Sequence, residues 1–354
     1  MRHFSKWIGT SICLAAVSMA VAAPQMTWAS DEFRNAKDIG NFADGRAPYQ
    51  DAVTEKWGYI DTEGNVVVEA QWDIADAFSD GYARVGYRSD SGSSYGYIDT
   101  EGDYVTTSGF KAGMGCSEGF GCLEGDEGYI YIDMKTGQDA FGKTFSAAHA
   151  FHDGLAGAAN ENGEWGYIDT TGAWVIEPQY ERATNFQEGL AAVMSGDLWG
   201  FINESGELVI DYQFDGYSTF SEGYADVEKD DMAGYIDTAG NVVIPLEYEN
   251  ASAFHDGTAW VKKDGKYFRI DKNGNQVGDN TWDNVFSGTG NTRVILDGKT
   301  GYANPENEVV LQPIYEDATA FTEDGLGAVK KNGRWYLIDQ SGVDILDGTD
   351  TTKE

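Results

Sequence analysis

The sequence is short of the residues on which most catalytic and metal sites are built. It contains only 4 histidines and 3 cysteines, and one of the cysteines, Cys13, lies in the apolar N-terminal segment. It has no Gly-x-Ser-x-Gly elbow, no His-Glu-x-x-His zinc motif and no glycine-rich phosphate loop. A pair of carboxylates, as in glycoside hydrolysis, is the catalytic arrangement left open. With 59 acidic residues, the sequence does not single out such a pair.

Basic residues are also few, because 24 Lys and Arg stand against 59 Asp and Glu, for a net charge of −35. Removing Arg2 and Lys6 with the N-terminal segment would leave −35 − 2 = −37. Nucleic acid and anionic membranes are excluded as partners, since both require clustered basic side chains. Three explanations of the negative charge stay open. It provides a solvated surface that keeps edge strands from pairing with other chains, it is an adaptation to a saline habitat, or it attracts cations and basic partners.

Long apolar runs are missing except for residues 8–23, which follow Arg2 and Lys6. No acidic residue precedes Asp31, and small residues allow cleavage after Ala29 or Ala22. This pattern predicts a secretory signal peptide over residues 1–29. The alternative, an uncleaved anchor, is disfavoured because the run is short and contains polar residues. We expect an exported protein, periplasmic, on the cell surface or secreted, without a membrane span once the signal is removed.

What the chain does have is one motif nine times over, clearest as Trp-Gly-Tyr-Ile-Asp-x-x-Gly at residues 57–64 and 165–172. Its closing position is occupied by Asp61, Asp99, Asp133, Asp169, Asn203, Asp237, Asp271, Asn304 and Asp339. A period of 33 to 38 residues between these positions indicates a repeat architecture, in which each unit buries its apolar surface against its neighbours.

Each unit predicts three short strands and one turn. Residues 57–61 and 66–68 are β-prone and flank a hairpin loop, in which we expect Gly64 to be left-handed. Further on, Tyr180, Ala183 and Phe186 recur at steps of three, which predicts a 3₁₀-like turn. A third strand follows the Phe-x-Asp/Glu-Gly segment.

The fold predicted from these units is all-β: nine three-stranded antiparallel units in an open curved solenoid. A closed β-propeller is the alternative, disfavoured because propeller blades have four strands and rings typically have four to eight blades. The repeats occupy residues 42–346. An N-terminal cap segment, residues 30–41, and a polar C-terminal tail, residues 347–354, complete the predicted organisation.

The recurring Asp predicts a structural role, because Asn203 and Asn304 stand in its place. The position therefore needs a side-chain oxygen that accepts backbone hydrogen bonds in a turn. A second acidic column precedes the glycine of Phe-x-Asp/Glu-Gly and includes Asp80, Glu118, Asp153, Glu188, Glu222, Asp256 and Asp324. In stacked units these carboxylates would form a row, and Asp80, Asp153, Glu188, Glu222 and Asp256 are calcium candidates. The alternating ligand spacing of a calcium loop is absent.

Alternation along Trp57, Tyr59 and Ile60 sends the two aromatic rings to one face and the isoleucine to the other. Since a single-layer stack cannot bury both faces equally, some rings would line an open groove. We expect Trp57, Trp165 and Trp199 to pack between units. The candidate ligand-binding surface for sugar rings or peptide side chains is then formed by Tyr59, Tyr97, Tyr167 and Tyr235.

Cys116 and Cys122 form an even pair on either side of a turn at Gly119. In an oxidising compartment they would close a small disulfide loop, which is the prediction. The alternative is two free thiols, with Cys116 replacing the phenylalanine found at Phe78 and Phe151.

The joint recurrence of Lys-Trp-Gly-Tyr-Ile-Asp at residues 56–61, Val-Ile-x-Pro-x-Tyr at 175–180 and Phe-x-Glu-Gly-x-Ala-x-Val at 186–193 resembles the WG-containing repeat of bacteria, also called the KWG repeat. The likeness covers residues 42–346. It departs at Tyr267-Phe268, Thr300-Gly301 and Trp335-Tyr336. The resemblance implies a β-rich interaction scaffold and supplies no catalytic residues. Residues 332–339 are also similar to cell-wall-binding repeats, which are shorter.

Two functions follow as hypotheses. The first is an exported, non-catalytic scaffold that binds a protein, a peptide or a cell-envelope glycan through an aromatic, acid-rimmed surface, with no cofactor other than a possible calcium ion. The alternative is an extracellular hydrolase that acts on a polymer with a carboxylate pair.

Overall fold

The structure is a computed structural model that describes residues 31–353 except 91, 107–108 and 287–289. The predicted signal peptide, residues 1–29, lies outside the described residues. Among those that are described, no helix is both long and apolar enough to span a bilayer. The described part of the chain contains one short helix, α1 (Asp31–Asn35), and strands β1 to β34.

The strands form nine small antiparallel sheets, which we number blades 1 to 9 in chain order. Blade 1 comprises β1 (Asp38–Ile39), β2 (Arg46–Gln50), β3 (Trp57–Asp61) and β4 (Val66–Trp72). Blade 2 comprises β5 (Ile74–Ala75), β6 (Tyr82–Ser89) and β7 (Gly92–Asp99). Blade 3 comprises β8 (Ala112–Gly113), β9 (Phe120–Glu124), β10 (Tyr129–Asp133) and β11 (Gln138–Asp139). Blade 4 comprises β12 (Ala147–Ala148), β13 (Leu155–Ala159), β14 (Trp165–Asp169) and β15 (Trp174–Tyr180). Blade 5 comprises β16 (Arg182–Ala183), β17 (Leu190–Ser195), β18 (Leu198–Asn203) and β19 (Leu208–Phe214). Blade 6 comprises β20 (Gly216–Tyr217), β21 (Tyr224–Lys229), β22 (Met232–Asp237) and β23 (Val242–Tyr248). Blade 7 comprises β24 (Asn250–Ala251), β25 (Thr258–Lys263), β26 (Lys266–Asp271) and β27 (Gln276–Trp282). Blade 8 comprises β28 (Asn284–Val285), β29 (Thr292–Leu296), β30 (Lys299–Ala303) and β31 (Val309–Tyr315). Blade 9 comprises β32 (Asp317–Ala318), β33 (Gly327–Lys331) and β34 (Arg334–Ile338).

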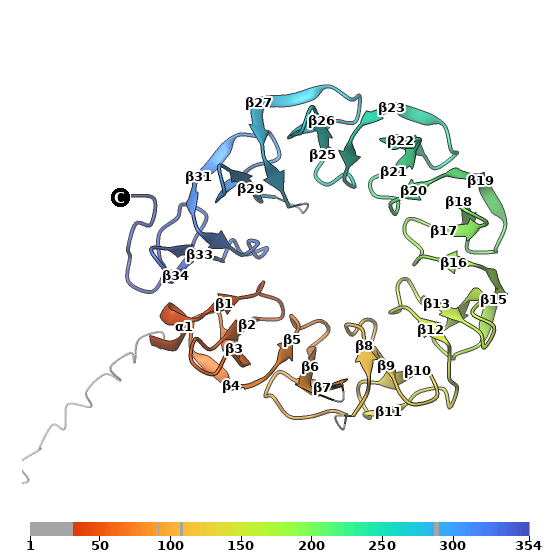
Figure 1. Ribbon diagram of the computed structural model, residues 1–354, viewed down its shortest axis with the longest axis horizontal. Helices are drawn as coiled ribbons and strands as arrows, with labels where there is room; N and C mark the ends of the chain where they lie inside the picture. The colour runs from red at the N-terminus through yellow and green to blue at the C-terminus, as the bar shows by residue number, and fades with distance from the viewer. Residues whose placement is uncertain (1–30, 91, 107–108, 287–289, 354) are drawn as a thin grey trace, which may run out of the picture.

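The blades stand side by side in a closed ring, with the short first strands nearest the axis and the fourth strands at the periphery (Figure 1). The protein is therefore a nine-bladed β-propeller. The predicted open solenoid is wrong, and the alternative of a closed propeller is confirmed. Most blades have four strands, because the segment expected as a 3₁₀-like turn contains a two-residue strand such as β16. Two residues are too few to show the alternation by which a strand is recognised in a sequence.

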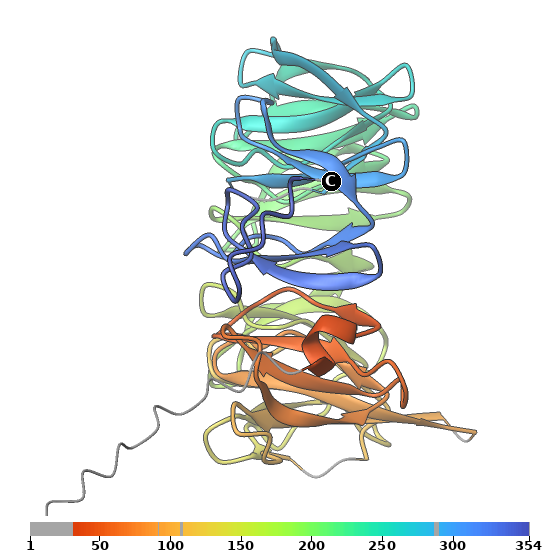
Figure 2. The same cartoon turned by 90° about the vertical axis from the view of Figure 1, so that its left-hand side faces the viewer.

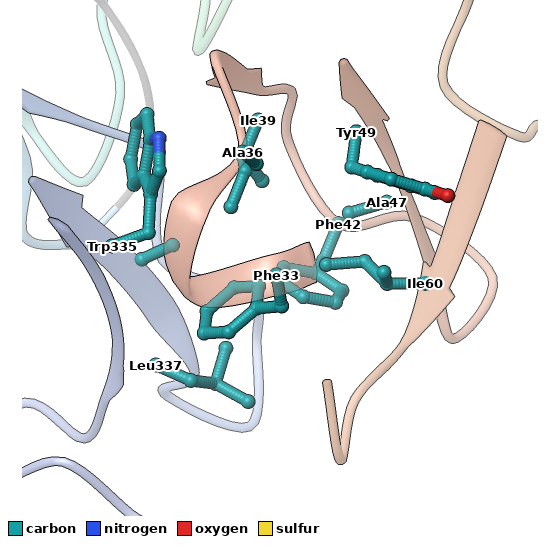
Figure 3. Close-up of a cluster of buried hydrophobic side chains, with 10 residues drawn as sticks. Phe33, Ala36, Ile39, Phe42, Ala47, Tyr49, Ile60, Trp335 and Leu337 are labelled. Atoms are coloured by element: carbon teal, nitrogen blue, oxygen red, sulfur yellow. The ribbon is translucent and has the colours of Figure 1, made fainter. Parts of the chain in front are cut away.

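Closure of the ring joins the two ends of the described chain. Helix α1 packs on β34, and the red N-terminal segment lies beside the blue last blade in both views (Figures 1 and 2). Phe33 and Phe42 from the N-terminal segment share one buried cluster with Trp335 and Leu337 (Figure 3). The guanidinium of Arg34 forms ion pairs with Asp344 and Asp347. The segments predicted to cap a stack thus lie at the junction between blades 9 and 1.

The hydrophobic core lies between adjacent blades. Tyr59 packs with Phe78 and Val85 of blade 2, whereas its neighbour Ile60 packs against residues of blade 9. The same division recurs in blade 4, where Tyr167 joins a cluster with blade 5 and Ile168 a cluster with blade 3. Because every sheet has a neighbour on each side, both of its faces are buried.

The glycine of the Trp-Gly motif is required where the fourth strand crosses the third. A Cβ atom on Gly166 would lie 2.4 Å from the carbonyl oxygen of Ile176, and one on Gly58 would lie 2.4 Å from that of Val68. The register between these strands shifts on both sides of the crossing, as in a β-bulge. Only glycine allows the two backbones to come so close.

Candidate functional site

In blades 1 to 7, the connection from the first strand to the second ends in a two-residue turn whose leading residue is acidic. In blade 5, Gln187 and Leu190 exchange two backbone hydrogen bonds, and both Glu188 (φ 51°) and Gly189 (φ 77°) are left-handed. Two successive positive φ angles define a type I′ turn, which favours Asp-Gly and Asn-Gly. Seven acidic side chains at this position have φ between 50° and 54°: Asp44, Asp80, Glu118, Asp153, Glu188, Glu222 and Asp256. We call them the acidic ring.

Carboxylates of the acidic ring also connect one blade to the next. Glu188 accepts hydrogen bonds from the backbone amides of Glu222 and Gly223, at 2.7 and 2.9 Å. Glu222 in turn accepts one from Gly257 at 3.1 Å. Equivalent bonds join Asp44 to Gly81 and Glu118 to Gly154. Turn chemistry favours aspartate at this position, and aspartate and glutamate both form the bond to the next blade, as Asp44 and Glu118 do.

The loops between third and fourth strands lie on the same face as the acidic ring, because the meander returns there. Asp169 accepts hydrogen bonds from the backbone amides of Thr171 and Ala173, at 2.9 and 3.1 Å. Asn203 accepts the same two bonds in blade 5, which confirms that the position needs an oxygen acceptor. The hydrogen bond from the Thr171 hydroxyl is the main cause of a lowered pKa for Asp169. We call this side of the ring the acidic face.

The calcium candidates are not brought together around a common point. The described residues contain no group of three or more His, Cys, Asp or Glu side chains that could hold a metal ion. Asp80, Asp153, Glu188, Glu222 and Asp256 each belong to a different blade. An open hollow on the acidic face is lined by Gly189, Asn203, Glu204 and Ser205, and thus by a single carboxylate.

The four tyrosines predicted to form a ligand surface are all buried, so that expectation is wrong. Tyr59, Tyr97, Tyr167 and Tyr235 are 0% exposed. Each hydroxyl donates a hydrogen bond to a backbone carbonyl in the next blade, respectively Asp76 at 2.9 Å, Met114 at 2.6 Å, Thr184 at 2.7 Å and Ser252 at 2.8 Å. The prediction assumed a single-layer stack with one open face, whereas the sheets pack face to face, so that the tyrosine face of each lies against the next blade in the chain.

The prediction that the tryptophans pack between units is confirmed for Trp199, which lies in the cluster between blades 5 and 6. Trp57 and Trp165 are only half-buried, although Trp199 is buried. Trp165 lies against the imidazole of His149, with ring centroids 4.4 Å apart, and Trp199 lies against Tyr217 at 4.1 Å. Tyrosine provides much of the packing between blades, because its ring lies tilted against the phenylalanine of the next blade, as that of Tyr167 does against Phe186, with ring centroids 4.6 Å apart.

The predicted disulfide is not formed, because Cys116 and Cys122 are both free and buried. Cys122 pairs with Tyr131 in the sheet and packs toward blade 4, whereas Cys116 belongs to the cluster on the other side of blade 3. Burial raises the pKa of each thiol to about 12. Neither cysteine is a nucleophile at neutral pH.

Two charged residues within the blades were not singled out from the sequence, the half-buried Asp226 and the buried Arg269. Asp226 stands on β21 beside Ser218, and burial raises its pKa to about 6. Arg269 takes the place of the motif tyrosine in blade 7 and is 2% exposed. Aligning the nine repeats would have revealed both, because the other repeats have other residue types at these two positions.

The fold and the repeated blade interfaces define a β-propeller repeat protein. The profile described as "WG containing repeat" matches residues 57–87, 165–199, 199–232, 234–267 and 301–335. The chain belongs to this WG repeat family, as its motifs indicated.

No curated protein matches the sequence. Among solved structures, the chain is similar to the computationally designed Ika8 protein, with 14% identity, a TM-score of 0.49, and coverage of 74% of this chain and 95% of that one. It is also similar to BamB from Moraxella catarrhalis (12% identity, TM-score 0.44, 76% and 94% coverage) and to AztD from Citrobacter koseri (12%, 0.40, 75% and 91%). The assignment of a nine-bladed propeller depends on the sheets of this chain itself.

Proposed function

We propose that the protein is an exported, non-catalytic scaffold that binds a basic segment of a partner protein on its acidic face. The observation that carries this proposal is the acidic ring, in which seven blades present a carboxylate at the same turn of the same face. Six of these side chains are exposed, and Glu222 is half-buried. A regular row of like charges attracts and orients a segment of opposite charge.

The opposite face differs in charge. The hairpins between second and third strands of blades 6 to 9 carry lysine or arginine, and several of these pair with nearby acids. Lys266 lies beside Asp283, and Lys263 lies 3.2 Å from Glu247. This mixture of signs makes the opposite face a poorer match for a basic ligand than the acidic face.

The absence of catalysis is part of the proposal. Acidic side chains of the ring stand one to a blade, and most of them accept backbone hydrogen bonds from the next blade. A glycoside hydrolase needs two carboxylates that flank one bond, with different environments. The repetition of one environment around the ring supports binding over hydrolysis.

Export is proposed from the pattern of residues 1–29. The high negative charge of the chain suits a protein that works outside the cell among basic partner segments, and Cys116 and Cys122 are protected there by burial.

A cell-envelope glycan is the second candidate ligand, at a different place from the predicted tyrosines. Tyr87 and Tyr104 of blade 2 are 36% and 43% exposed. Tyr104 is held in place by a 2.8 Å hydrogen bond from the indole of Trp72. Exposed aromatic faces with polar edges suit sugar rings.

Binding to the acidic face is tested with a lysine-rich peptide labelled for fluorescence anisotropy, at several salt concentrations. The ring variant carries Asp80→Asn, Asp153→Asn and Asp256→Asn, because asparagine is tolerated in type I′ turns. The control carries Asp215→Asn, Asp230→Asn and Asp283→Asn, with the same charge change on the opposite face. We expect the ring variant to weaken binding by about tenfold or more and the control by less than about twofold. Equal losses, or none, would contradict the proposal.

A further inference from the structure

The interface between blades 7 and 8 breaks the pattern by which the other blades pack. Where blade 4 has Gly166 and Tyr167, blade 7 has Phe268 and Arg269. In blades 4, 6 and 8 the motif tyrosine is buried and bonds to a carbonyl of the next blade. A neutral aromatic side chain is thus replaced by a charged one inside the core.

Arg269 is enclosed by side chains that satisfy only part of its hydrogen-bonding capacity. Its Nη1 donates to the hydroxyl of Thr258 at 2.5 Å, and its Nη2 donates to the hydroxyl of Thr292 at 2.8 Å. The guanidinium carbon lies 4.3 Å from the ring centre of Trp260. Among the described residues, the Nε of Arg269 and the Nε1 of Trp260 are buried donors without an acceptor.

The charge of Arg269 has no direct counter-ion within the described part of the chain, where no carboxylate lies within ion-pair distance of it. The carboxylates of Asp256 and Glu306 act on the guanidinium only at longer range. Among the described residues, Arg34 pairs with Asp344 and Arg84 pairs with Asp76 at 2.7 Å, whereas the half-buried Arg293 of blade 8 donates to the backbone carbonyl of Ala318 at 2.7 Å.

An unpaired buried charge is unstable, because desolvation removes the hydration of the ion and nothing replaces it. Burial lowers the pKa of Arg269 to about 10, which still leaves the side chain charged at neutral pH. Stacking on Trp260 offsets part of the loss of hydration. The Nε–H of Arg269 and the Nε1–H of Trp260 therefore require an acceptor, and the hydroxyl of Thr292, which accepts from Arg269, has a proton to donate.

We propose that Arg269, Trp260 and Thr292 form a site for a single monovalent anion between blades 7 and 8. One guanidinium neutralises one negative charge, and the donors around it are N–H and O–H groups, which suit a halide ion or a carboxylate group. The anion completes the interface in the place where other blades use a tyrosine hydroxyl and a carbonyl.

The site is tested by thermal unfolding of the wild-type protein in sodium chloride, bromide or formate, against sodium gluconate at equal ionic strength. Gluconate is too large for a buried site and therefore controls for screening. We expect Tm to rise by a few degrees with chloride or formate and then to level off, because an anion that binds only the folded state stabilises it. A larger effect of formate than of chloride identifies a ligand carboxylate as the occupant, and the reverse identifies an inorganic halide.

Two variants separate this site from general salt effects. Arg269→Met removes the charge, and the saturable anion response should disappear. Arg84→Met is the matched control, because that arginine has its own carboxylate, and the response should remain. A response of equal size in Arg269→Met, or no response in the wild type, would overturn the proposal.

Diffraction from wild-type crystals soaked in bromide tests the site without any variant. An anomalous peak in contact with the Nε of Arg269 supports the proposal even if Arg269→Met does not fold. Bromide peaks elsewhere with none at Arg269 would overturn it.

Discussion

Blades 4 and 7 are built from the same repeat but solve the crossing of their third and fourth strands differently. In blade 4, Gly166 lies under the fourth strand, and the register shifts on both sides of Tyr167. In blade 7, Phe268 occupies that place. The pairing of β26 with β27 shifts register once, between Tyr267 and Arg269, and the residues of β27 left unpaired there include Gly278, which has φ +64°. Gly278 does not replace Gly166, because a Cβ on it would first meet the carbonyl oxygen of Glu306 in blade 8, at 2.8 Å, rather than an atom of β26. The crossing in blade 7 therefore accommodates a side chain on the third strand through its different register.

The difference extends to the face that each blade presents to its neighbour. Tyr167 offers a ring and one hydroxyl, both matched by blade 5. Arg269 offers a charge and several donors, of which blade 8 matches only some. Blade 4 therefore shows what the repeat needs for packing, and blade 7 shows a departure that packing alone does not explain.

The largest effect is expected from placing the same side chain at the two crossings. Gly166→Val should lower the free energy of unfolding by about 3 kcal/mol or more, because the new Cβ would meet backbone atoms of Ile176 and Pro178. Phe268→Val should lower it by only about 1 kcal/mol, since blade 7 already accommodates a side chain there. Urea unfolding of both variants measures the difference. Similar losses of stability in the two variants would show that the close approach of the third and fourth strands does not explain the glycine at position 166.

Removing the blade 4 tyrosine should be nearly as damaging. Tyr167→Ala is expected to cost about 3–5 kcal/mol, because it leaves a cavity beside Phe186. Tyr167→Phe should cost about 1 kcal/mol, the contribution of one hydrogen bond, since Phe201 occupies the equivalent position in blade 5. Thermal and urea unfolding provide the values. A loss below about 1 kcal/mol for Tyr167→Ala would contradict tyrosine as the main contact between blades.

Asp226→Asn should stabilise the protein at pH 7 by about 1–3 kcal/mol. Burial raises the folded-state pKa of Asp226 to about 6, above its ordinary value of 3.8, so the folded state prefers the protonated form. The ionised carboxylate therefore lowers the stability of the folded state above about pH 6, and this loss of stability vanishes below about pH 4. The measurement is the stability difference between variant and wild type from pH 4 to 8. A difference that does not grow as pH rises through this window would refute the role of Asp226.

The smallest effect is expected at the acidic ring. Glu188→Ala should cost about 1 kcal/mol, because the amides of Glu222 and Gly223 lose their acceptor. Glu188→Gln, which keeps one oxygen, should cost about half as much. Glu204→Ala, an exposed acid on the same face, serves as control and should change stability by less than about 0.5 kcal/mol. If Glu188→Ala matches the control, the bonds between blades do not contribute to stability.

Local chemistry was readable in the sequence where it depends on a few adjacent residues. The loop at residues 61–64 could be assigned because Asp and Gly have strong turn preferences, and Gly64 is left-handed as expected, with φ +76°. The two-residue inner strands could not be assigned, because they are defined by pairing with the next strand and have no pattern of their own.

The candidate site was predicted in part. Six members of the predicted acidic column lie at equivalent turns, whereas Asp324 lies in a different turn, between Thr322 and Leu326. The hydrogen bonds from this column to the next blade depend on the angle between blades. The tyrosines were assigned to the wrong surface, since Tyr59 and its equivalents look amphipathic in any single unit. Arg34 contacts Asp344 across 310 residues, and no local pattern indicates such a pair.

The sequence by itself determined the number of repeats, the longer strands of each unit and the hairpin loops between them, because these follow from local backbone preferences that act in the same way in each repeat. Only the tertiary structure decided that the repeats close into a ring. Closure depends on the small rotation between one blade and the next, which is set by how tyrosine, phenylalanine and glycine pack across each interface and which accumulates over nine blades. The face-to-face packing of successive blades buries the tyrosine faces, and closure gives blades 1 and 9 their second neighbour.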